Sequence, residues 1–380
     1  MILSTIQEYL TFDDVLILPG YSDFSRSDID LTSKLTRTMT LKLPFVAAPM
    51  DTVCESKLAI ALGQLGGLGI IHRNLTIADE AAEVKHVKDA GLIAGAAIGA
   101  SNGYEDRIMG LVTAGLDVVV VDSAHGYDKK IIEAITFIKK AYPKLQVIGG
   151  NIATAEGARA LISAGADGLR VGMGPGAICT TRIVSGMGVP QLTAIIETVK
   201  IAKESGVPVI ADGGIKYSGD MVKALAAGAS TVMMGSYFSA AEEAPGKIVE
   251  LEARHVPARF KNILKNGAST YKFKEYRGMG SVAAMQHGAK IKSEDEFHGK
   301  DYKSRVLVAE GVEGLVPVKG SLQSIVEQAV GGIKSGMYYI GAKNLQELTE
   351  KSRFIKITQA SLTESHPHDI LITNPGENYS

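Results

Sequence analysis

Cysteine is scarce in this sequence, which has Cys54 and Cys179 and no other cysteine in 380 residues. Two cysteines cannot form the disulfide framework of a secreted domain, so we expect a protein of the reducing cytoplasm. A net charge of −1 gives no reason to expect nucleic acid or an anionic membrane as a partner. The sequence also lacks an apolar run of the roughly 18 residues that span a bilayer, and its N-terminus has no signal-peptide pattern. These absences predict a soluble protein.

From residue 45 onward, short apolar runs alternate with amphipathic segments of helical length. The apolar runs lie near 45–48, 68–72, 92–98, 117–122, 146–150, 169–172, 207–211 and 231–235. The amphipathic segments include 56–65, 77–90, 128–141, 155–164, 192–205 and 220–227. Strands that alternate with helices pair in parallel and are covered on both faces, which is typical of α/β proteins. Eight such units predict one (β/α)8 TIM barrel over 1–380; a doubly wound sheet is the less favoured alternative, because the repeats have no long break.

Two connections are longer than the others. One follows the sixth strand and contains Cys179, and the other follows the eighth strand over 236–320, before a helix expected at 321–335. Ahead of the barrel, 11–19 is expected to form an entry strand and 31–43 a short hairpin. Connections after barrel strands lie at the carboxyl ends, where active sites are built. We therefore expect both long connections to meet at one rim.

The stretch 172–182 has three glycines and a proline ahead of a single cysteine, Cys179. Glycines at this density let the backbone approach a ligand closely. A lone cysteine at the end of such a loop is a candidate nucleophile, and the neighbouring hydroxyls and Arg182 favour its thiolate form. The alternative is a buried cysteine that packs as a small hydrophobic residue, which we expect of Cys54.

Carbonyl groups clustered in this loop suit a monovalent cation, because hard cations prefer oxygen ligands. A zinc site is not supported, since no spacing of histidine, cysteine and carboxylate residues fits one. The segment 364–369 contains two histidines and two carboxylates, but Pro367 works against a regular helical array of ligands. We expect a structural role or a subunit contact for that segment.

Polar residues and glycines follow several of the expected strands, at 122–126, 149–151, 212–214 and 235–236. Glycines after the seventh and eighth strands suit a phosphate site, and Asp212 could accept hydrogen bonds from a ribose diol. Each of these residues could instead serve only a βα turn. Their recurrence on one rim favours a shared site.

Eight stretches, taken in order, match one known family. They are 10–15 (LTFDDV), 48–53 (APMDTV), 66–72 (GGLGIIH), 122–126 (DSAHG), 149–154 (GGNIAT), the cysteine loop, 211–215 (ADGGI) and 276–281 (YRGMGS). Over nearly its whole length the chain resembles the IMP dehydrogenase/GMP reductase family. Many relatives carry a pair of regulatory CBS modules between the second barrel helix and the third strand. Here 88–91 joins these elements directly, so we expect the modules to be absent.

The resemblance implies NAD-dependent chemistry at C2 of a purine nucleotide. Cys179 would attack C2 and form a covalent thioimidate after a hydride leaves for NAD, which divides a difficult oxidation into two steps. The resemblance assigns the ribose hydroxyls to Asp212; the phosphate to Gly214, Gly235, Ser236 and Tyr276; the base to Gly278, Met279 and Gly280; and the nicotinamide side to Asp122, Ser123 and Asn151. It also implies a homotetramer and K⁺ bound by carbonyls of Gly174, Gly176 and Cys179, completed by carbonyls near Glu364, Ser365 and His366 of a neighbouring subunit.

Thr181 and Glu310 belong together in this interpretation. Glu310 begins the stretch 310–314, which matches the end of the family's mobile flap, here 282–310. A hydroxyl linked to a carboxylate can move a proton to or from water or ammonia. Both branches of the family use this pair, so it does not separate them.

Two departures from the family pattern bear on the direction of the reaction. The Arg-Tyr pair that dehydrogenases have early in the flap is missing from 288–297, and Ala177 stands where a serine usually contacts the phosphate. Tyr302 and Arg305 lie further on, at a spacing that does not match. Lys290, Lys292 or Arg305 could replace the missing arginine, although lysine is not equivalent to arginine.

The stretch 182–191 and the length of the flap favour the dehydrogenase branch. We therefore expect IMP dehydrogenase activity, the oxidation of IMP to XMP. The first alternative is GMP reductase activity, which converts GMP and NADPH to IMP and ammonia. The second is a catalytically impaired nucleotide-binding homologue, against which the presence of Cys179, Thr181, Asp212 and Glu310 argues.

Overall fold

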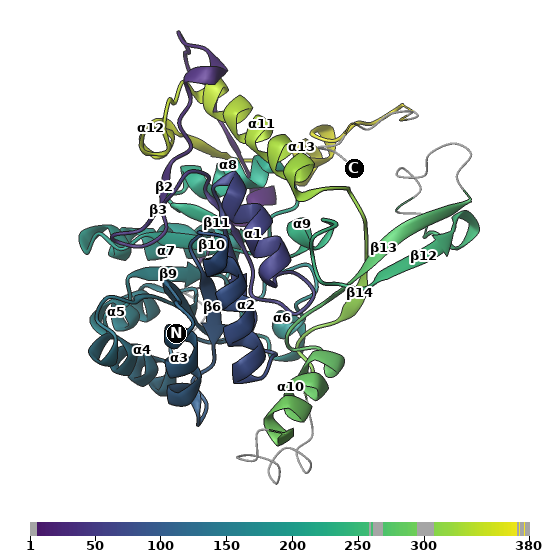
Figure 1. Ribbon diagram of the computed structural model, residues 1–380. Coiled ribbons are helices and arrows are strands. Elements are labelled where there is room, and N and C mark those ends of the chain that lie inside the picture. The colour runs from purple at the N-terminus through teal and green to yellow at the C-terminus, as the bar shows by residue number, and fades with distance from the viewer. Residues whose placement is uncertain are drawn as a thin grey trace.

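Eight parallel strands close into a barrel in which the last strand, β11, pairs with the first, β4 (Figure 1). The structure is a computed structural model that describes residues 6–257, 260, 269–294, 308–370, 372 and 376. The barrel strands are β4 (Phe45–Ala47), β5 (Leu68–Ile71), β6 (Gly95–Ile98), β7 (Val118–Asp122), β8 (Gln146–Ile152), β9 (Gly168–Val171), β10 (Val209–Asp212) and β11 (Thr231–Met234). The expected (β/α)8 barrel is confirmed, and the doubly wound sheet is wrong because the sheet closes on itself.

Helices cover the outside of the barrel. They are α1 (Ser56–Leu65), α2 (Ile77–Asp89), α3 (Tyr104–Thr113), α4 (Lys129–Ala141), α5 (Ala155–Ser163), α7 (Gln191–Glu204), α8 (Ser218–Ala226) and α11 (Leu322–Ile340). In α4, Ile131, Ile135 and Ile138 recur at helical spacing and are buried. The carboxylate of Asp128 caps this helix by accepting a hydrogen bond from the backbone N–H of Lys130 at 2.9 Å.

The core has two layers, because successive residues of a strand point to opposite faces. In β7, Val118 and Val120 belong to the cluster inside the barrel, whereas Val119 and Val121 belong to the cluster between barrel and helices. The hairpin of β2 (Ser33–Lys34) and β3 (Thr40–Leu41) adds the buried residue Leu41 to the inner cluster. The hairpin expected at 31–43 is thus confirmed, and the opposite end of the barrel is left for the active site.

The N-terminal entry segment contains a 3₁₀ helix, η2 (Phe12–Asp14), and the strand β1 (Val15–Ile17). Strand β1 pairs antiparallel with β15 (Phe354–Lys356) near the C-terminus. The expected entry strand at 11–19 is therefore present in part of that range. The remaining short elements are η3 (Arg26–Asp28), η4 (Ala253–His255), α6 (Thr181–Val184), α9 (Ser236–Ser239), α12 (Leu345–Lys351) and α13 (Gln359–Glu364).

The long connection after β11 forms an antiparallel sheet of β12 (Ile248–Glu252), β13 (Thr270–Arg277) and β14 (Glu313–Pro317), which extends to one side of the barrel (Figure 1). Helix α10 (Val282–Glu294) follows β13 and covers the start of the expected flap, 282–310. Tyr302, Arg305 and the side chain of Lys292 lie outside the described residues. The insertion of 236–320 is thus described at both of its ends.

One helix end was predicted wrongly. Helix α11 continues to Ile340 instead of stopping at 335, and Met337 and Ile340 are buried. Gly336 lies inside the helix, where a Cβ would come within 2.8 Å of the Val222 side chain on α8. This glycine permits close helix packing, and the helix ends instead at Gly341, which has φ of +84°.

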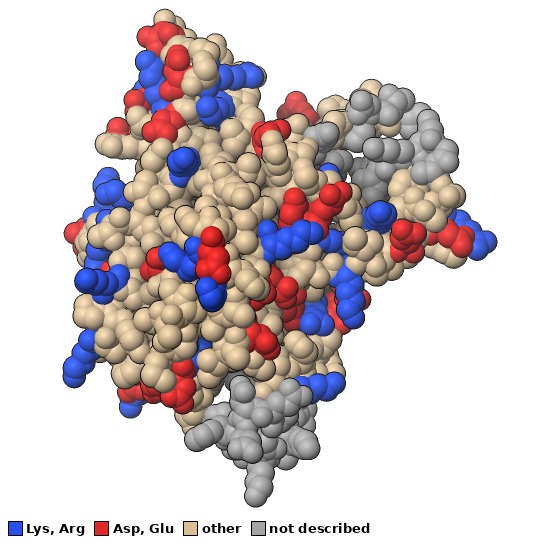
Figure 2. All heavy atoms as spheres, viewed as in Figure 1, with Lys and Arg blue, Asp and Glu red and all other residues tan. Residues whose placement is uncertain are grey.

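Figure 2 shows Lys and Arg interspersed with Asp and Glu over the visible face, with no extended area of one sign. This mixture agrees with the net charge of −1. None of the described helices is both long enough and apolar enough to cross a membrane.

Candidate active site

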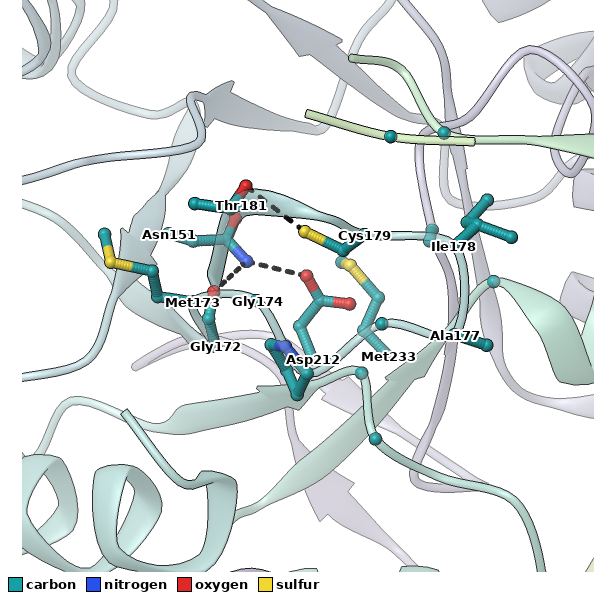
Figure 3. A pocket seen from close by; sticks show the side chains of 18 of the residues that line it. Asn151, Gly172, Met173, Gly174, Ala177, Ile178, Cys179, Thr181, Asp212 and Met233 are labelled. Carbon is teal, nitrogen blue, oxygen red and sulfur yellow. Dashed lines mark hydrogen bonds between the residues drawn. The ribbon is translucent and has the colours of Figure 1, made fainter. Parts of the chain in front are cut away.

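A cavity of about 640 Å³ opens at the carboxyl ends of the barrel strands, a size suited to a small molecule. Its walls come from loops after β4, β5, β7, β8, β9, β10 and β11 and from the insertion. Figure 3 shows Asn151, the cysteine loop, Asp212 and Met233 around it. The lining includes these residues assigned from the sequence: Asp122, Ser123, Asn151, Gly174, Gly176, Cys179, Thr181, Asp212, Gly214, Gly235, Ser236, Tyr276, Gly278, Met279, Gly280 and Glu310. The two long connections do meet at one rim, as expected.

The loop that presents Cys179 is folded tightly around Arg182. The guanidinium donates hydrogen bonds to the carbonyls of Met173 at 3.2 Å and Val189 at 2.7 Å, so it ties the two ends of the loop together. Gly174, with φ of +77°, passes so close that a Cβ would lie 2.6 Å from Arg182 Cγ. Larger residues are excluded there by conformation and by space. Arg182 therefore has a structural role beside the cysteine.

Cys179, Thr181 and Glu310 form a chain of hydrogen bonds at the cavity wall. Cys179 Sγ donates to Thr181 Oγ1 at 3.3 Å, and Thr181 Oγ1 donates to Glu310 Oε2 at 2.8 Å. Figure 3 shows the thiol and the hydroxyl pointing toward one another. A backbone hydrogen bond also joins the cysteine loop to the segment of Glu310, since the N–H of Thr180 donates to the carbonyl of Glu310 at 2.9 Å. A proton can pass along this chain between the reacting centre and the carboxylate.

Two carboxylates that line the cavity share one buried guanidinium. Arg170, the third residue of β9, pairs through Nη1 with Asp122 and through Nε with Asp212 at 2.8 Å. Arg73 adds a second contact to Asp122 at 3.2 Å. Asn151 donates from Nδ2 to Asp212 Oδ2 at 2.7 Å and to the Gly172 carbonyl at 2.9 Å. The ends of four barrel strands are thereby joined around the cavity.

The charges in this network alter the pKa of Asp122. Burial by itself would raise the pKa of the carboxyl, but the guanidinium groups of Arg170 and Arg73 outweigh burial and lower it below its usual value. The pKa of Arg170 is raised, because its two carboxylate partners outweigh its own burial. The Asp122 carboxylate and the Arg170 guanidinium are therefore both charged at neutral pH.

Arg170 was missed by the sequence interpretation. The signal was a charged residue inside the apolar run 168–171, and such a residue at the carboxyl end of a barrel strand indicates the active site. The run was interpreted only as a buried strand. Arg73 and Met50, which also line the cavity, carried no comparable signal.

The expected phosphate residues lie together between β10, β11 and β13. Gly213 and Gly214 have φ of +87° and +78°, and the N–H of Gly213 donates to the carbonyl of Met233 at 3.3 Å. A Cβ on Gly235 would come within 2.8 Å of the Tyr276 hydroxyl oxygen. Burial raises the pKa of Tyr276, so its hydroxyl remains a hydrogen-bond donor at neutral pH.

The residues expected to contact the base form a loop, 278–280, that we call the base loop. The N–H of Gly278 donates to the carbonyl of Val312 at 3.1 Å, and the N–H of Glu310 donates to the carbonyl of Gly280 at 3.1 Å. The N–H of Val312 donates in turn to the carbonyl of Ile178 at 2.9 Å. The base loop, the segment of Glu310 and the cysteine loop are therefore connected through their backbones.

The cation residues expected from the resemblance are in two separate places in the chain. Gly174, Gly176 and Cys179 lie in the cysteine loop, whereas Glu364, Ser365 and His366 lie at the end of α13 and do not line the cavity. The carbonyls of Gly174 and Cys179 accept no hydrogen bond from the described residues, while that of Gly176 accepts one from the N–H of Cys179. No cluster of His, Cys, Asp and Glu suited to a metal ion occurs in the described part of the chain.

The fold and the site together define a (β/α)8-barrel enzyme with a candidate cysteine nucleophile at the carboxyl ends of its strands. The family model described as "IMP dehydrogenase / GMP reductase domain" matches residues 9–368. The chain belongs to the IMP dehydrogenase/GMP reductase family.

Curated relatives include three bacterial proteins named inosine-5'-monophosphate dehydrogenase. The protein from Borreliella burgdorferi is 40% identical over 414 residues, covering 96% of this chain and 98% of its own. The protein from Aquifex aeolicus is 38% identical over 502 residues, covering 98% of each chain. The protein from Halalkalibacterium halodurans is 36% identical over 500 residues, again covering 98% of each.

Proposed function

We propose that this protein is an IMP dehydrogenase, which oxidises IMP to XMP with NAD⁺ in the cytoplasm. The observation that carries the proposal is the chain from Cys179 through Thr181 to Glu310 at the wall of a nucleotide-sized cavity. The names of the three bacterial relatives support it.

The proposal gives each part of IMP a contact in the cavity. Asp212 Oδ2 is held by Arg170 and Asn151, while Oδ1 accepts no hydrogen bond from the described residues. That oxygen is available to the ribose hydroxyls. The glycine-rich turns after β10 and β11, with Ser236 and Tyr276, hold the phosphate, and the base loop contacts the purine.

The chemistry proceeds in two steps that divide one difficult oxidation. Cys179 first loses its thiol proton to solvent. Its Sγ then adds as a thiolate to C2 of IMP, and the hydride on C2 leaves, so a thioimidate remains on the cysteine. Asp122, Ser123 and Asn151 would line the side that holds NAD⁺, which when bound would supply the hydride acceptor. Water then attacks C2 and the C–S bond breaks, releasing XMP and the thiolate. Thr181 relays the proton of this water to Glu310.

The cysteine loop fits a monovalent cation in part. Hard cations take oxygen ligands, and the carbonyls of Gly174 and Cys179 have no other partner among the described residues. Gly176 would supply a third carbonyl. A K⁺ ion there would hold the loop in shape, with residues 364–366 of a second copy completing the shell in a homotetramer.

The lengths of the alignments support the expected absence of the CBS modules. The alignment to the Aquifex protein spans 502 positions and this chain has 380 residues, so at least 122 positions of that relative have no counterpart here. The alignment to the Borreliella protein spans 414 positions, so that relative is nearer in length. We propose that the missing segment lies between α2 and β6, which are connected in this chain by the short segment 90–94.

The alternative is GMP reductase activity, favoured by Ala177 and by the missing Arg-Tyr pair at 288–297. The test is to incubate the purified protein with IMP and NAD⁺ and, separately, with GMP and NADPH, while following the absorbance of the reduced nicotinamide. We expect NADH to form in the first mixture. Consumption of NADPH in the second mixture alone would establish the reductase. Stabilisation by IMP without turnover in either mixture would indicate the impaired homologue.

Replacing Glu310 by glutamine is expected to lower the steady-state kcat by about 10²-fold, because the amide cannot accept the proton of the attacking water. The first turnover should persist, since hydride transfer precedes hydrolysis. A stopped-flow experiment would then show a burst of NADH followed by a slow phase. Glu250→Gln, an exposed change on β12 of the same insertion, serves as the control and should leave both phases unchanged. A normal steady-state rate for Glu310→Gln would remove Glu310 from the mechanism.

A further inference from the structure

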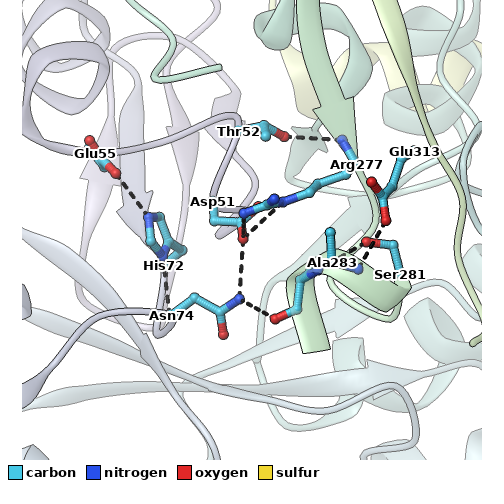
Figure 4. A network of polar contacts seen from close by, with 10 residues as sticks. Asp51, Thr52, Glu55, His72, Asn74, Arg277, Ser281, Ala283 and Glu313 are labelled. Atoms are coloured by element: carbon cyan, nitrogen blue, oxygen red, sulfur yellow. Dashed lines mark hydrogen bonds and ion pairs between the residues drawn. The ribbon is translucent and has the colours of Figure 1, made fainter. Parts of the chain in front are cut away.

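Two of the stretches that match the family, 48–53 and 66–72, contain residues that do not line the cavity. Asp51, from the first stretch, meets Arg277 at the end of β13 and Asn74 just after β5 (Figure 4). None of these three side chains lines the cavity. Arg277 directly precedes the base loop and pairs with Asp51, and Asn74 contacts both Asp51 and helix α10, which follows the loop.

Arg277 is held at both its side chain and its backbone. Its Nε donates to Asp51 Oδ1 at 3.1 Å and its Nη2 donates to Asp51 Oδ2 at 2.7 Å, so the pair is bidentate. The backbone N–H of Arg277 donates to Thr52 Oγ1 at 3.2 Å. Only 3% of the Asp51 side chain is exposed, compared with 24% of Arg277. A bidentate pair with a buried carboxylate fixes direction as well as distance. The base loop starts at the next residue.

Asn74 connects this pair to helix α10. Its Nδ2 donates to Asp51 Oδ2 at 3.2 Å and to the carbonyl of Ala284 at 3.2 Å. One turn further along α10, a Cβ on Gly288 would lie 3.0 Å from Asn74 Oδ1, so the helix rests directly on the amide. Asn74 itself is buried. The first two turns of α10 are thus positioned by a residue of the barrel.

The histidine of the second stretch orients Asn74. The backbone N–H of Asn74 donates to His72 Nδ1 at 3.1 Å, and His72 Nε2 lies 3.2 Å from Glu55 Oε1. These contacts require Nδ1 to accept and Nε2 to carry the proton. The ring is 1% exposed. Residues of both stretches therefore support the same contact with α10.

The base loop is fastened at each end by this group of residues. Arg277 precedes it, and Ser281 follows it, with Ser281 Oγ accepting a hydrogen bond from the N–H of Ala284 at 3.3 Å. The carbonyl of Gly280, inside the loop, accepts the hydrogen bond from Glu310. A displacement of Arg277 or α10 would therefore move the base contact and the Glu310 carboxylate together.

We propose that Asp51, Asn74 and Arg277 are positioning residues that set the base loop, and with it Glu310, relative to Cys179. The proposal rests on the proposed function, because it takes the base loop to contact the purine of IMP. Misplacing a reacting group by about 1 Å can cost roughly 10²-fold in rate. The three residues thus control KM through the base contact and kcat through Glu310.

The test compares Asn74→Ala, Arg277→Ala and Arg277→Lys with the full-length wild type. We expect the two alanine variants to lose about 10- to 100-fold in kcat/KM for IMP, with KM raised and kcat lowered. Arg277→Lys, which keeps the charge but loses the bidentate geometry, should be intermediate. Asp51→Ala is also made alone, and the double variant Asp51→Ala/Arg277→Ala should lose no more activity than the worse of Asp51→Ala and Arg277→Ala, because the two residues act as one unit.

Asn344→Ala is the matched control. Asn344 caps α12 by accepting a hydrogen bond from the N–H of Glu347 at 2.9 Å, far along the chain from the base loop. It should lower Tm without changing kcat or KM. Normal kinetics for Asn74→Ala and Arg277→Ala would overturn the proposal, and so would a loss of activity that only matches the loss of folded protein.

The outcome for the wild type separates this proposal from the proposed function. A wild type that does not oxidise IMP contradicts the function alone. Calorimetry then measures the affinity of each variant for IMP or GMP, whichever the wild type binds. This affinity reports the contact of the base loop with the purine and needs no turnover. A weaker affinity in Asn74→Ala and Arg277→Ala but not in Asn344→Ala supports the positioning role, and equal affinities overturn it.

Discussion

Replacing Cys179 by alanine is expected to lower the turnover of IMP by at least about 10³-fold, because no other cysteine lies among the described residues that line the cavity. IMP should still bind, since Asp212, the phosphate turns and the base loop are unchanged. Turnover is measured by NADH formation and binding by calorimetry. NADH formation at the wild-type rate would contradict the covalent mechanism.

Cys54→Ala is the control for this experiment. Cys54 is fully buried beneath α1, and burial raises the pKa of its thiol, so it remains protonated and unreactive. The substitution should cost about 1 kcal/mol of stability through a small cavity and leave kcat unchanged. A loss of turnover in this variant as large as that of Cys179→Ala would show that the assay reports folding instead of chemistry.

Replacing Arg170 by methionine is expected to lower the free energy of unfolding by about 3–5 kcal/mol and to remove most activity. The Arg170 side chain is 9% exposed and pairs with two carboxylates whose side chains are each 13% exposed. Removing one partner of a buried ion pair leaves uncompensated charge. Without Arg170, Asp122 and Asp212 repel each other, so the residues that we propose to hold the ribose and the nicotinamide lose their alignment. Urea denaturation and steady-state kinetics measure the two effects.

The pH dependence of this loss of stability has a definite sign. In the wild type, the lowered pKa of Asp122 contributes stability above the unfolded-state pKa of an aspartate, about 3.9, and this contribution is lost as the pH falls through the lower native value. In Arg170→Met, much of the guanidinium attraction is gone and burial acts to raise the pKa. The difference in stability between wild type and variant should therefore be larger at pH 7 than at pH 4. Equal differences at both would rule out this account.

Arg254→Met provides the matched control for the Arg170 substitution. Arg254 pairs with Glu252 at 2.7 Å, but 74% of its side chain is exposed. An exposed pair of this kind contributes little, so neither stability nor activity should change measurably.

Much of the fold follows from local pattern. The barrel strands begin and end within three residues of the expected runs, because a strand buried on both faces reads as an uninterrupted apolar run between glycines or polar residues. The end of α11 did not follow from pattern. A glycine at 336 looks like a helix end, yet it is required by the approach of Val222 from α8. Only packing distinguishes the two meanings of such a glycine.

For the site, the sequence by itself determined which residues are chemically capable: the cysteine among glycines, the hydroxyl beside it, and the polar strand ends. These features are local in the chain, and parallel strands bring their carboxyl ends to one rim whatever their order. The family resemblance already paired Thr181 with Glu310, 129 residues away, and the tertiary structure supplied the direct contact at 2.8 Å. Only the tertiary structure decided that Arg170 serves two carboxylates and that Asn74 supports α10. Such contacts depend on the direction of side chains across elements that are distant in sequence, and no periodicity along the chain encodes that direction.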